Sequence, residues 1–452
     1  MTQALYTARK TLKNYTNGGT VLIAATVLAL IIVNIPGMQG FYNGLWTHEI
    51  ALQVGKFNLF SHHGEPMSVM QFINDALMAV FFFTVGLEIK REILVGELSS
   101  FRQALLPIVG AVGGMLVPVC IFWLMSSGTP YSRGAAIPMA TDIAFSLGVL
   151  AMLGNRVPVS LKIFLTTLAV VDDIGGILVI AIFYSGNISF WMLGAAAVLL
   201  CVLMLGSRLR IQSKIFYLGI GAFVWFLFLN AGIHPTIAGV LIAFCVPARP
   251  VYAPAKYIKT IRSDISYFAH EDDESLNSKT ILNKNQLNWL KEIESASDKV
   301  ISPLQDLEDS LHPVVNYIIV PLFAFANAGI YLGDISLAST FEGVSLTIIL
   351  GLVAGKFLGI FLFSLLCIKL GWASLPEGCN YRQLASISLL GGIGFTVSLF
   401  IANLSFGTGD VLMSQLLNNS KLGILVGSLI AGIGGFLALH FTLPAKKEVN
   451  AG

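Results

Sequence analysis

The sequence predicts an all-α polytopic membrane protein with about twelve transmembrane helices, on three observations. Of the 452 residues, 55% are hydrophobic and only 12% are charged, whereas soluble domains carry about 25% charged residues. The apolar residues form runs, most of them long enough for a helix to cross the hydrocarbon core of a bilayer. Glycine, proline and charged residues separate the runs, so we expect a single integral membrane domain over residues 1–452.

The ends of the apolar runs place the individual spans. The eighth run is short, and glycine, proline or polar residues interrupt the fourth and the eleventh. The predicted spans cover residues 19–35, 67–89, 104–126, 136–153, 159–184, 188–206, 215–231, 235–248, 313–332, 343–370, 385–404 and 421–442.

The distribution of lysine and arginine predicts the orientation. An even number of spans places both termini on one side, and that side carries all but four of the 27 basic residues. Lys56, Arg133 and Lys421 lie on the other side, and Lys356 lies within a span. Because basic loops stay in the cytoplasm, both termini are predicted to be cytoplasmic. Residues 249–312 then form an extended cytoplasmic loop between the eighth and ninth spans, a flexible or loosely helical tether.

Two consecutive aspartates, Asp172 and Asp173, lie in the middle of the fifth span. An ionisable side chain near the bilayer centre costs about 3 kcal/mol or more and usually marks a pathway for ions or protons. Lys356, in the middle of the tenth span, lies at the same depth. A buried ion pair that only holds two helices together would need one aspartate. Because successive helix positions point about 100° apart, we expect one aspartate to pair with Lys356 and the other to face an aqueous cavity.

Paired buried carboxylates suit the exchange of a cation for protons. A buried carboxyl group favours its neutral form and releases the proton in alkali, where a small hard cation can bind the same oxygens. Two aspartates can release two protons for one monovalent cation, so such an exchange would move net charge. Lys356 can add to the proton count if it also releases a proton. We expect no cofactor, since the five cysteines lack metal-binding spacing.

The fourth and eleventh spans each contain an interruption. Proline and glycine flank Thr141 and Asp142 in the fourth span, and Gly392 and Gly394 break the eleventh. Thr and Asp are also common helix caps, and glycines can simply permit close helix packing. Inside a membrane, however, a broken helix persists only where protein or water satisfies its backbone. Two such interruptions indicate inverted repeats, spans three to five against ten to twelve, with a site where the discontinuous helices IV and XI cross.

Four further polar residues lie in or beside the spans. Asp75 is either a functional residue or a structural hydrogen-bond partner, and Asn327 is expected to form a hydrogen bond with a neighbouring helix. Glu88 is either an anchor at the membrane interface or part of a sensor. His234 lies beside a proline between the seventh and eighth spans, where a single histidine is usually incidental.

Three other classes of membrane protein use charges within the bilayer. An intramembrane aspartyl protease needs two aspartates that face each other across a shared water, whereas neighbours on one helix diverge. A cation channel favours a continuous pore lined by rings of carbonyls or charges from symmetric subunits. A sodium-coupled symporter of organic anions would need a larger polar cavity, which the sequence leaves open. The asymmetric charge cluster favours an exchanger, not an enzyme, and the net charge of +2 gives no reason to expect a nucleic-acid partner.

These polar positions lie within longer motifs that carry a family resemblance. With them the chain resembles the bacterial NhaA-type sodium/proton antiporters over nearly its whole length. Two departures are the longer loop at 249–312 and Phe357, which stands where a proline is expected. The motifs cover residues 73–82, 85–92, 140–145, 171–175, 232–236, 321–329, 355–356 and 392–396.

The resemblance implies a Na⁺(Li⁺)/H⁺ antiporter of the bacterial inner membrane that is electrogenic, active in alkali and used for sodium and pH homeostasis. Its partners would be Na⁺ or Li⁺, protons, the lipid bilayer and a second copy in a homodimer formed through an outer hairpin. It also implies that Asp172 and Asp173 bind the cation and the protons, that Asp142 and Thr141 lie at the helix crossing, and that Lys356 pairs with Asp172. The residues linked to a pH response are Glu88, Glu308 and His234.

Overall fold

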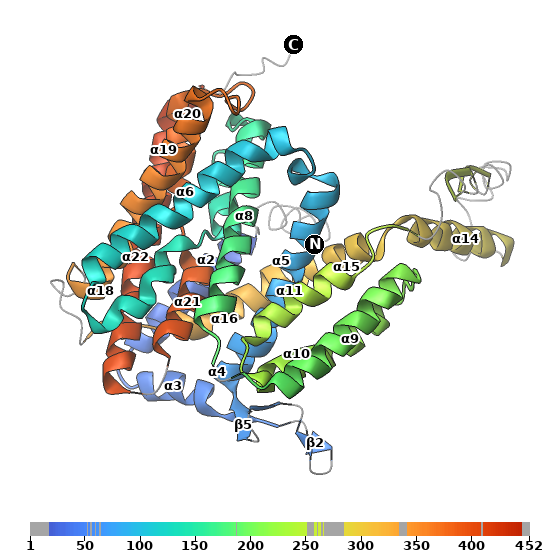
Figure 1. Ribbon diagram of the computed structural model, residues 1–452, viewed down its shortest axis with the longest axis horizontal. Coiled ribbons are helices and arrows are strands. Elements are labelled where there is room, and N and C mark those ends of the chain that lie inside the picture. Colours follow the sequence, from blue (N-terminus) through green and yellow to red (C-terminus); the bar gives the residue numbers. More distant parts are fainter. Residues whose placement is uncertain are drawn as a thin grey trace, which may run out of the picture.

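The fold is described by a computed structural model, in which the described residues are 18–51, 53–54, 57–58, 60–62, 65–186, 188–250, 257–259, 261–263, 265, 284–333, 341–407 and 410–444. In this part of the chain helices make up nearly the whole structure (Figure 1). Eight helices are long and apolar enough to cross a membrane, or up to eleven if each bent helix pair counts as one span. The predicted all-α polytopic membrane fold is confirmed at this level.

Most apolar helices begin and end close to the predicted spans. Helices form because lipid offers no partner to backbone N–H and C=O groups, which a helix satisfies within itself. The first half of the chain contains α2 (Gly18–Asn34), α3 (Gln39–Thr47), α4 (Val69–Gln71), α5 (Met78–Val95), α6 (Phe101–Ser126), α7 (Ile143–Met152), α8 (Val159–Phe183), α9 (Phe190–Arg208) and α10 (Lys214–Ala231). The second half contains α11 (Pro235–Cys245), α14 (Lys284–Val300), α15 (Pro303–Val314), α16 (Val320–Asn327), α18 (Gly343–Leu350), α19 (Lys356–Lys369), α20 (Tyr381–Leu390), α21 (Phe395–Phe406) and α22 (Val411–Thr442).

One end of the helix bundle carries the described strands, and we call it the hairpin end (Figure 1). Three strands form an antiparallel sheet in the order β1-β5-β4, and β2 pairs with β3 in a second antiparallel pair. The last strand leads directly into α4, so the second apolar span starts at this end. The strands are β1 (Glu49–Ile50), β2 (Gln53–Val54), β3 (Phe57–Asn58), β4 (Ser61–His62) and β5 (Glu65–Ser68).

The opposite end of the bundle, which we call the basic end, collects lysine and arginine residues. Lys90 and Arg91 lie in the second half of α5, Arg102 lies in the first turn of α6, and Arg156 lies three residues before the start of α8. Helix α14 also lies on this side of the molecule and projects away from the bundle (Figure 1).

Two apolar segments change direction near their middle, at the positions that the sequence indicates. The 3₁₀ helix η3 (Pro130–Met139) is bent by 46° from α7, and α20 is bent by 44° from α21. Residues 140–142 and 391–394 form the two breaks. A third bend of 119° separates α2 from α3, which lies at the hairpin end (Figure 1). The backbone groups at the two central breaks therefore need partners outside their own helices.

Two π-helical turns, local widenings that often accompany functional positions, lie close to predicted site residues. The turn η1 (Phe72–Leu77) precedes α5 and contains Asp75. The turn η6 (Gly351–Gly355) ends directly before Lys356, the first residue of α19. Both turns rotate the residues that follow them relative to a regular helix.

The ninth apolar segment begins earlier than the sequence predicts. Its helix α15 starts at Pro303, with Ser302 as the N-cap, whereas the predicted span starts at residue 313. Pro313 lies inside this helix, and the π-helical turn η5 (Val315–Ile319) follows it. Because proline lacks a backbone donor and crowds the preceding turn, it widens the helix there instead of starting it.

The largest buried cluster surrounds the two breaks. Phe323, Phe395 and Phe400 belong to it, each no more than 1% exposed. In the same region α6 packs along α19 and α8. A second cluster joins α5 to α9, α10, α11 and α15. The core of the molecule therefore holds the broken helices in place from several sides.

Candidate functional site

The two broken segments cross, and each supplies hydrogen-bond partners to the other. The backbone N–H of Asp142 donates to the carbonyl of Ile393 over 2.6 Å. The hydroxyl of Ser146 donates to the Leu390 carbonyl over 3.1 Å, and that of Ser398 donates to the Ile137 carbonyl over 2.7 Å. Polar backbone groups at and beside the two breaks are thus paired with groups of the other segment.

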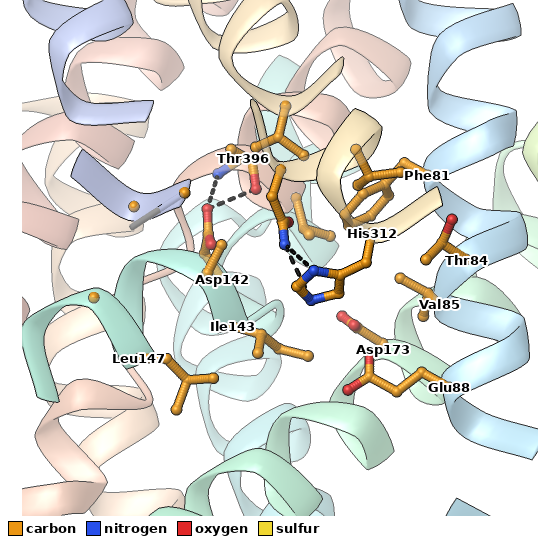
Figure 2. A pocket seen from close by; sticks show the side chains of 18 of the residues that line it. Phe81, Thr84, Val85, Glu88, Asp142, Ile143, Leu147, Asp173, His312 and Thr396 are labelled. Carbon is orange, nitrogen blue, oxygen red and sulfur yellow. Dashed lines mark hydrogen bonds between the residues drawn. The ribbon is translucent and has the colours of Figure 1, made fainter. Parts of the chain in front are cut away.

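Asp142 is the polar centre of the crossing. One carboxylate oxygen accepts from the Phe145 backbone N–H over 2.9 Å, which caps α7. The other accepts from the Thr396 backbone N–H over 3.0 Å and from the Thr396 hydroxyl over 2.6 Å. The side chain therefore lies at the N-terminal ends of α7 and α21, where the helix dipoles favour negative charge. Figure 2 shows this contact.

Gly392 and Gly394 lie at the break between α20 and α21, where other chain segments approach them closely. A Cβ atom on Gly392 would collide with the Leu352 carbonyl, and one on Gly394 would collide with the Ser398 hydroxyl. The two glycines therefore allow the crossing helices to come together, which is the packing role that the sequence left open beside a role in the site.

Asp172 pairs with Lys356 in the middle of the bundle. The Lys356 ammonium donates to Asp172 Oδ2, and both side chains are fully buried. The Thr141 hydroxyl oxygen lies 2.6 Å from the same carboxylate oxygen, 3.0 Å from Lys356 Nζ and 2.8 Å from the Gly391 carbonyl. The hydroxyl can donate its single proton either to Asp172 Oδ2 or to the Gly391 carbonyl at the end of α20. This cluster ties the fifth span to both breaks.

Asp173 faces a cavity instead of a cation. It is 4% exposed, and its Oδ1 has no hydrogen-bond partner within the described residues. The cavity has a volume of about 370 Å³, and Thr141, Asp142 and Glu88 also line it. Its walls reach the exposed His312 towards the basic end. Figure 2 shows Asp173, Glu88 and His312 around the same space.

The two adjacent aspartates therefore have different surroundings, as the sequence argument expects of neighbours on a helix. Asp172 is neutralised by Lys356, and Asp173 is left with access to the cavity. Carboxylate and hydroxyl oxygens suit a hard monovalent cation or a proton. Among the described residues no group of three or more His, Cys, Asp or Glu side chains could hold a resident metal ion. The arrangement can bind and release a small cation at one acidic side chain.

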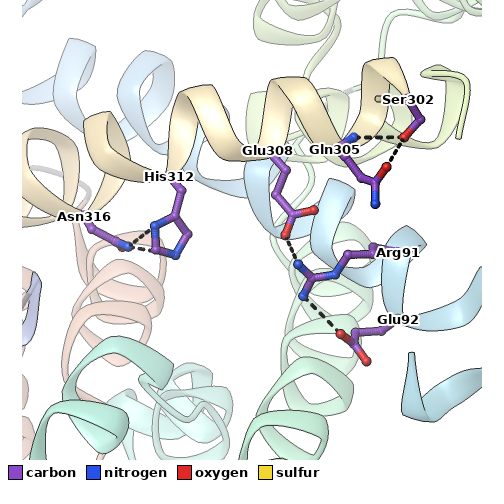
Figure 3. Close-up of polar contacts among 7 residues, drawn as sticks. All are labelled: Arg91, Glu92, Ser302, Gln305, Glu308, His312 and Asn316. Carbon is purple, nitrogen blue, oxygen red and sulfur yellow. Dashed lines mark hydrogen bonds and ion pairs between the residues drawn. The ribbon is translucent and has the colours of Figure 1, made fainter. Parts of the chain in front are cut away.

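Glu88 and Glu308 lie between this cavity and the basic end. Arg91 Nη1 donates to Glu308 Oε1 over 2.6 Å, and Arg91 Nη2 donates to Glu92 Oε1 over 3.1 Å (Figure 3). This chain of charges links α5 to α15. Glu88 is on α5 as well and lines the cavity beside Asp173. Glu88 therefore lies in the cavity wall beside Asp173, whereas Glu308 does not line the cavity and lies on α15 at the Arg91 contact.

Asp75 and His234 lie together, but away from the cavity. His234 Nε2 is 3.7 Å from Asp75 Oδ1, and His234 Nδ1 is 2.9 Å from the Thr236 hydroxyl. The Trp225 indole N–H donates to the Asp75 carbonyl over 3.1 Å. Neither Asp75 nor His234 lines the cavity with Asp173. They form a separate polar group towards the hairpin end.

Asn327 connects three helical segments through side-chain hydrogen bonds. Its amide donates to Asn74 Oδ1 over 3.0 Å, and its side-chain oxygen accepts from Asn403 Nδ2 over 2.8 Å. The predicted hydrogen bond to a neighbouring helix is therefore present. Asn74 lies in η1, Asn327 ends α16 and Asn403 lies in α21.

Sequence reasoning did not single out three residues that the structure brings to these groups. Thr396 is the second residue after the glycine-rich break, and a hydroxyl group so close to a break could have been recognised in the sequence. Arg91 stands next to the predicted Glu88 motif, but its partner Glu308 is remote in sequence. Asn403 lies in an apolar stretch with no motif around it, so no local signal pointed to its bond with Asn327.

The chain is similar to known sodium/proton antiporters over nearly its whole length. The family model described as Na⁺/H⁺ antiporter 1 matches residues 9–439. The chain is 56% identical over 435 residues to the Na(+)/H(+) antiporter NhaA of Phocaeicola vulgatus, covering 95% of this chain and 94% of the relative. It is 50% identical over 448 residues to the NhaA of Bacteroides thetaiotaomicron, covering 98% and 100%. A protein of Syntrophotalea carbinolica named Na(+)/H(+) antiporter NhaA 2 is 45% identical over 429 residues, covering 94% of each chain.

Proposed function

The chain belongs to the Na⁺/H⁺ antiporter 1 family, and from this premise we propose that it is a secondary active transporter that exchanges Na⁺ or Li⁺ for protons at Asp173 and Asp172. One observation carries the proposal. A buried carboxylate, Asp173, faces a cavity while its neighbour Asp172 is already paired with Lys356. The relatives are named as antiporters, not as enzymes, which fits a transporter that makes and breaks no covalent bond in its substrate.

Exchange follows from competition for the same oxygens. With a proton on Asp173 the site is neutral, and with the proton gone the carboxylate attracts a small hard cation. Thr141 and Asp142 also line the cavity and can supply further oxygens to a partly dehydrated cation. Since a cation and a proton do not bind these oxygens together, binding of one releases the other.

Lys356 provides the second proton. When a cation approaches the central carboxylates, it competes with the ammonium for Asp172, and a Lys356 freed from its partner in an apolar site can release a proton. Two protons then move for one monovalent cation, one of them from Asp173. The exchange is therefore electrogenic, and the membrane potential contributes to it.

Transport also requires that the site open to each side in turn. Twelve spans arranged as inverted repeats would place the crossing of the broken helices at the midplane, where one half can move against the other. Asp142 offsets the positive N-terminal ends of α7 and α21, and Lys356 lies near the carbonyl end of α20 through Thr141. The crossing can therefore move with its charges balanced.

The basic end is assigned to the cytoplasm by its lysine and arginine residues. The protein then resides in the bacterial inner membrane with both termini and residues 249–312 in the cytoplasm. The cavity that leads to Asp173 opens to the cytoplasm in this conformation, ready to take up Na⁺. The strands at the hairpin end face outwards and are the proposed contact of a homodimer.

Activation in alkali is assigned to three residues outside the central pair. Glu88 lines the cation route, and Glu308 holds α15 against α5 through Arg91. His234 lies on the other side of the site, next to Asp75. Protonation of these groups changes the charge along the route and at the contacts between helices, so the exchange rate depends on pH.

The test uses the purified full-length protein in proteoliposomes with an acidic lumen. Addition of Na⁺ or Li⁺ outside should dissipate the pH gradient, recorded by recovery of a quenched pH-sensitive dye over a pH series. Asp173→Asn should abolish the recovery because the amide cannot exchange a proton for a cation. Asp410→Asn, an exposed N-cap replaced by another good cap, is the matched control and should exchange normally. Near-normal exchange by Asp173→Asn would refute the assignment.

A further inference from the structure

A second cavity lies at the basic end, and it shares no lining residue with the cavity of Asp173. It has a volume of about 380 Å³ and is lined by residues within 97–107, 160–167 and 373–377. The first two of these segments contain the first turns of α6 and α8, and the third belongs to the connection between α19 and α20 (Figure 1). The proposed exchange of Na⁺ for protons does not account for this cavity.

Two long helices begin at the second cavity. Arg102 and Gln103 in the first turn of α6 and Ser160 in the first turn of α8 all line it. Neither helix has a side-chain hydrogen bond at its N-cap, so the first backbone N–H groups of both helices lack a side-chain acceptor. Such N–H groups, together with the positive ends of the helix dipoles, favour an anionic group such as a phosphate.

A buried hydroxyl group further inside the cavity also lacks a partner. Thr167 lines the cavity about 10 Å from Ser160 along the axis of α8, and it is 2% exposed. Within the described residues its hydroxyl has no hydrogen-bond partner, whereas the Thr166 hydroxyl donates to the Lys162 carbonyl over 2.9 Å. Since buried polar groups are nearly always hydrogen-bonded, the Thr167 hydroxyl is available to a molecule in the cavity.

Three charged side chains of both signs line the same cavity. Arg102 and Glu377 are exposed, and Glu97 is half-buried. None of the three forms an ion pair within the described residues. A bare phosphate would be attracted by Arg102 and the helix ends but repelled by the two carboxylates. A group that carries a phosphate together with an ammonium is complementary to all three charges.

Exposed apolar side chains flank the cavity, which favours a ligand with hydrocarbon chains. Ile163 lines the cavity and is 38% exposed. Phe101 and Val159, the first residues of α6 and α8, are 78% and 69% exposed. Because both helices are long and apolar enough to cross a membrane, their ends are at the level where lipid headgroups lie. A soluble metabolite would gain nothing from these apolar side chains.

We propose that the second cavity binds the headgroup of an aminophospholipid, phosphatidylethanolamine, from the surrounding bilayer. The phosphate lies at the N-terminal ends of α6 and α8 beside Arg102, and the ammonium donates hydrogen bonds to Glu97 and Glu377. Deeper in the cavity the Thr167 hydroxyl donates to an ester carbonyl of the lipid, and the acyl chains leave past Ile163. This lipid site is separate from the exchange of Na⁺ for protons.

A lipid bound in this way connects elements that lead to the central site. Helix α8 carries Asp172 and Asp173, and α20 ends at Gly391, whose carbonyl accepts from the Thr141 hydroxyl. The lipid joins the first turns of α6 and α8 to the connection that precedes α20. Because a ligand that binds only the folded state stabilises it, bound lipid raises the unfolding temperature.

The test measures lipid binding to the purified full-length protein in detergent. Phosphatidylethanolamine, phosphatidylcholine and phosphatidylglycerol with identical acyl chains are added in turn, and Tm and Kd are recorded by thermal unfolding and native mass spectrometry. Phosphatidylethanolamine should raise Tm in a saturable manner. The other two should bind about tenfold more weakly, because the methylated ammonium of phosphatidylcholine cannot donate hydrogen bonds and phosphatidylglycerol has no ammonium.

Variants then assign the contacts. Arg102→Gln and Glu377→Gln should each weaken phosphatidylethanolamine binding about tenfold, and Glu377→Gln should also reduce its preference over phosphatidylglycerol. The matched control is Arg382→Gln, an exposed arginine in the first turn of α20 that does not line the cavity. Thr167→Val should weaken binding by a smaller factor. Thr166→Val, which removes a hydroxyl already bonded within α8, should not.

Each other result decides against the lipid site. Equal binding of the three lipids would overturn it, as would wild-type binding by both Arg102→Gln and Glu377→Gln. Equal stabilisation by O-phosphoethanolamine, the soluble headgroup, would show that the ligand is a soluble zwitterion and not a lipid. Asp173→Asn, which is expected to lose exchange, should bind the lipid normally, so a failure of lipid binding and a failure of the proposed function are distinct results.

Discussion

Two regions around the central aspartates are built in opposite ways. On the side of the basic end, Asp173 faces an open cavity, and its Oδ1 has no partner among the described residues. On the side of the hairpin end the bundle is closed. The Phe400 ring packs edge-on against the His234 ring at 5.2 Å between centroids, and the Phe82 ring lies 5.6 Å away. Asn403 closes the same side through its bond to Asn327.

The difference shows how one fold can keep a charged site accessible from only one side. In the open region Asp173 Oδ1 has no partner among the described residues, so this carboxylate can bind an ion from the cavity. The closed region satisfies its polar groups with one another and fills the remaining space with aromatic rings, which exclude water. The Lys356–Asp172 pair lies at the boundary and belongs to the closed region by its burial. Under the exchange proposed above, these two regions would change roles.

The largest effect is expected from breaking the pair at the boundary. Lys356→Ala leaves Asp172 as an unpaired buried charge, which should cost about 3–5 kcal/mol of stability. We expect a clear fall in Tm, measured on the purified protein in detergent. Lys369→Ala, an exposed lysine at the end of the same helix, should leave Tm almost unchanged. Adding Asp172→Asn to Lys356→Ala should recover part of the loss, and an unchanged Tm in the single variant would contradict the pairing.

A smaller effect should follow from loosening the closed region. Asn403→Ala removes one hydrogen bond across helices, worth about 1 kcal/mol, which is a factor of about five in the balance between two conformations. Since the bond closes the hairpin end, its loss should raise the KM for Na⁺ supplied at the basic end, measured in everted vesicles.

The control for this variant is Ser405→Ala on the same helix. Ser405 Oγ lies 2.9 Å from the hydroxyl oxygen of Tyr184, which follows the end of α8. This contact joins α21 to α8 and does not involve Asn327. The control variant should leave the KM for Na⁺ near the wild-type value. If Asn403→Ala and Ser405→Ala behave alike, the Asn327 bond does not help to close the hairpin end.

The smallest effect is expected outside both regions. Deleting residues 266–283, which lie outside the described residues and within the loop that the sequence predicts, should change kcat by less than about twofold, because the length of a loop has little thermodynamic cost. The pH profile of exchange, followed in the same vesicles, can shift while transport is kept. Complete loss of exchange with normal expression would show that the loop is required for transport.

The sequence predicts the helical membrane fold and the charged residues of the site. It does not predict every helix boundary or which side chains pair, for physical reasons. Apolar runs report burial in lipid, so they gave the helical membrane fold, while the count of twelve spans stays a prediction. The start of α15 at Pro303 was missed because a proline was taken as a beginning. Asp172, Asp173 and Lys356 stood out because charge is rare in such runs. Which aspartate binds the lysine came from the family resemblance, since the residues alone left both possible.

The sequence by itself determined where charge and broken backbone must be buried, because lipid accepts neither without a partner. Only the tertiary structure decided who those partners are: Thr396 for Asp142, Thr141 for Asp172 and Arg91 for Glu308. Such pairs join segments far apart in the chain, and hydrophobic pattern carries no information on distance between segments. The same holds for the cavity of about 380 Å³ at the basic end, whose walls come from residues 97–107, 160–167 and 373–377.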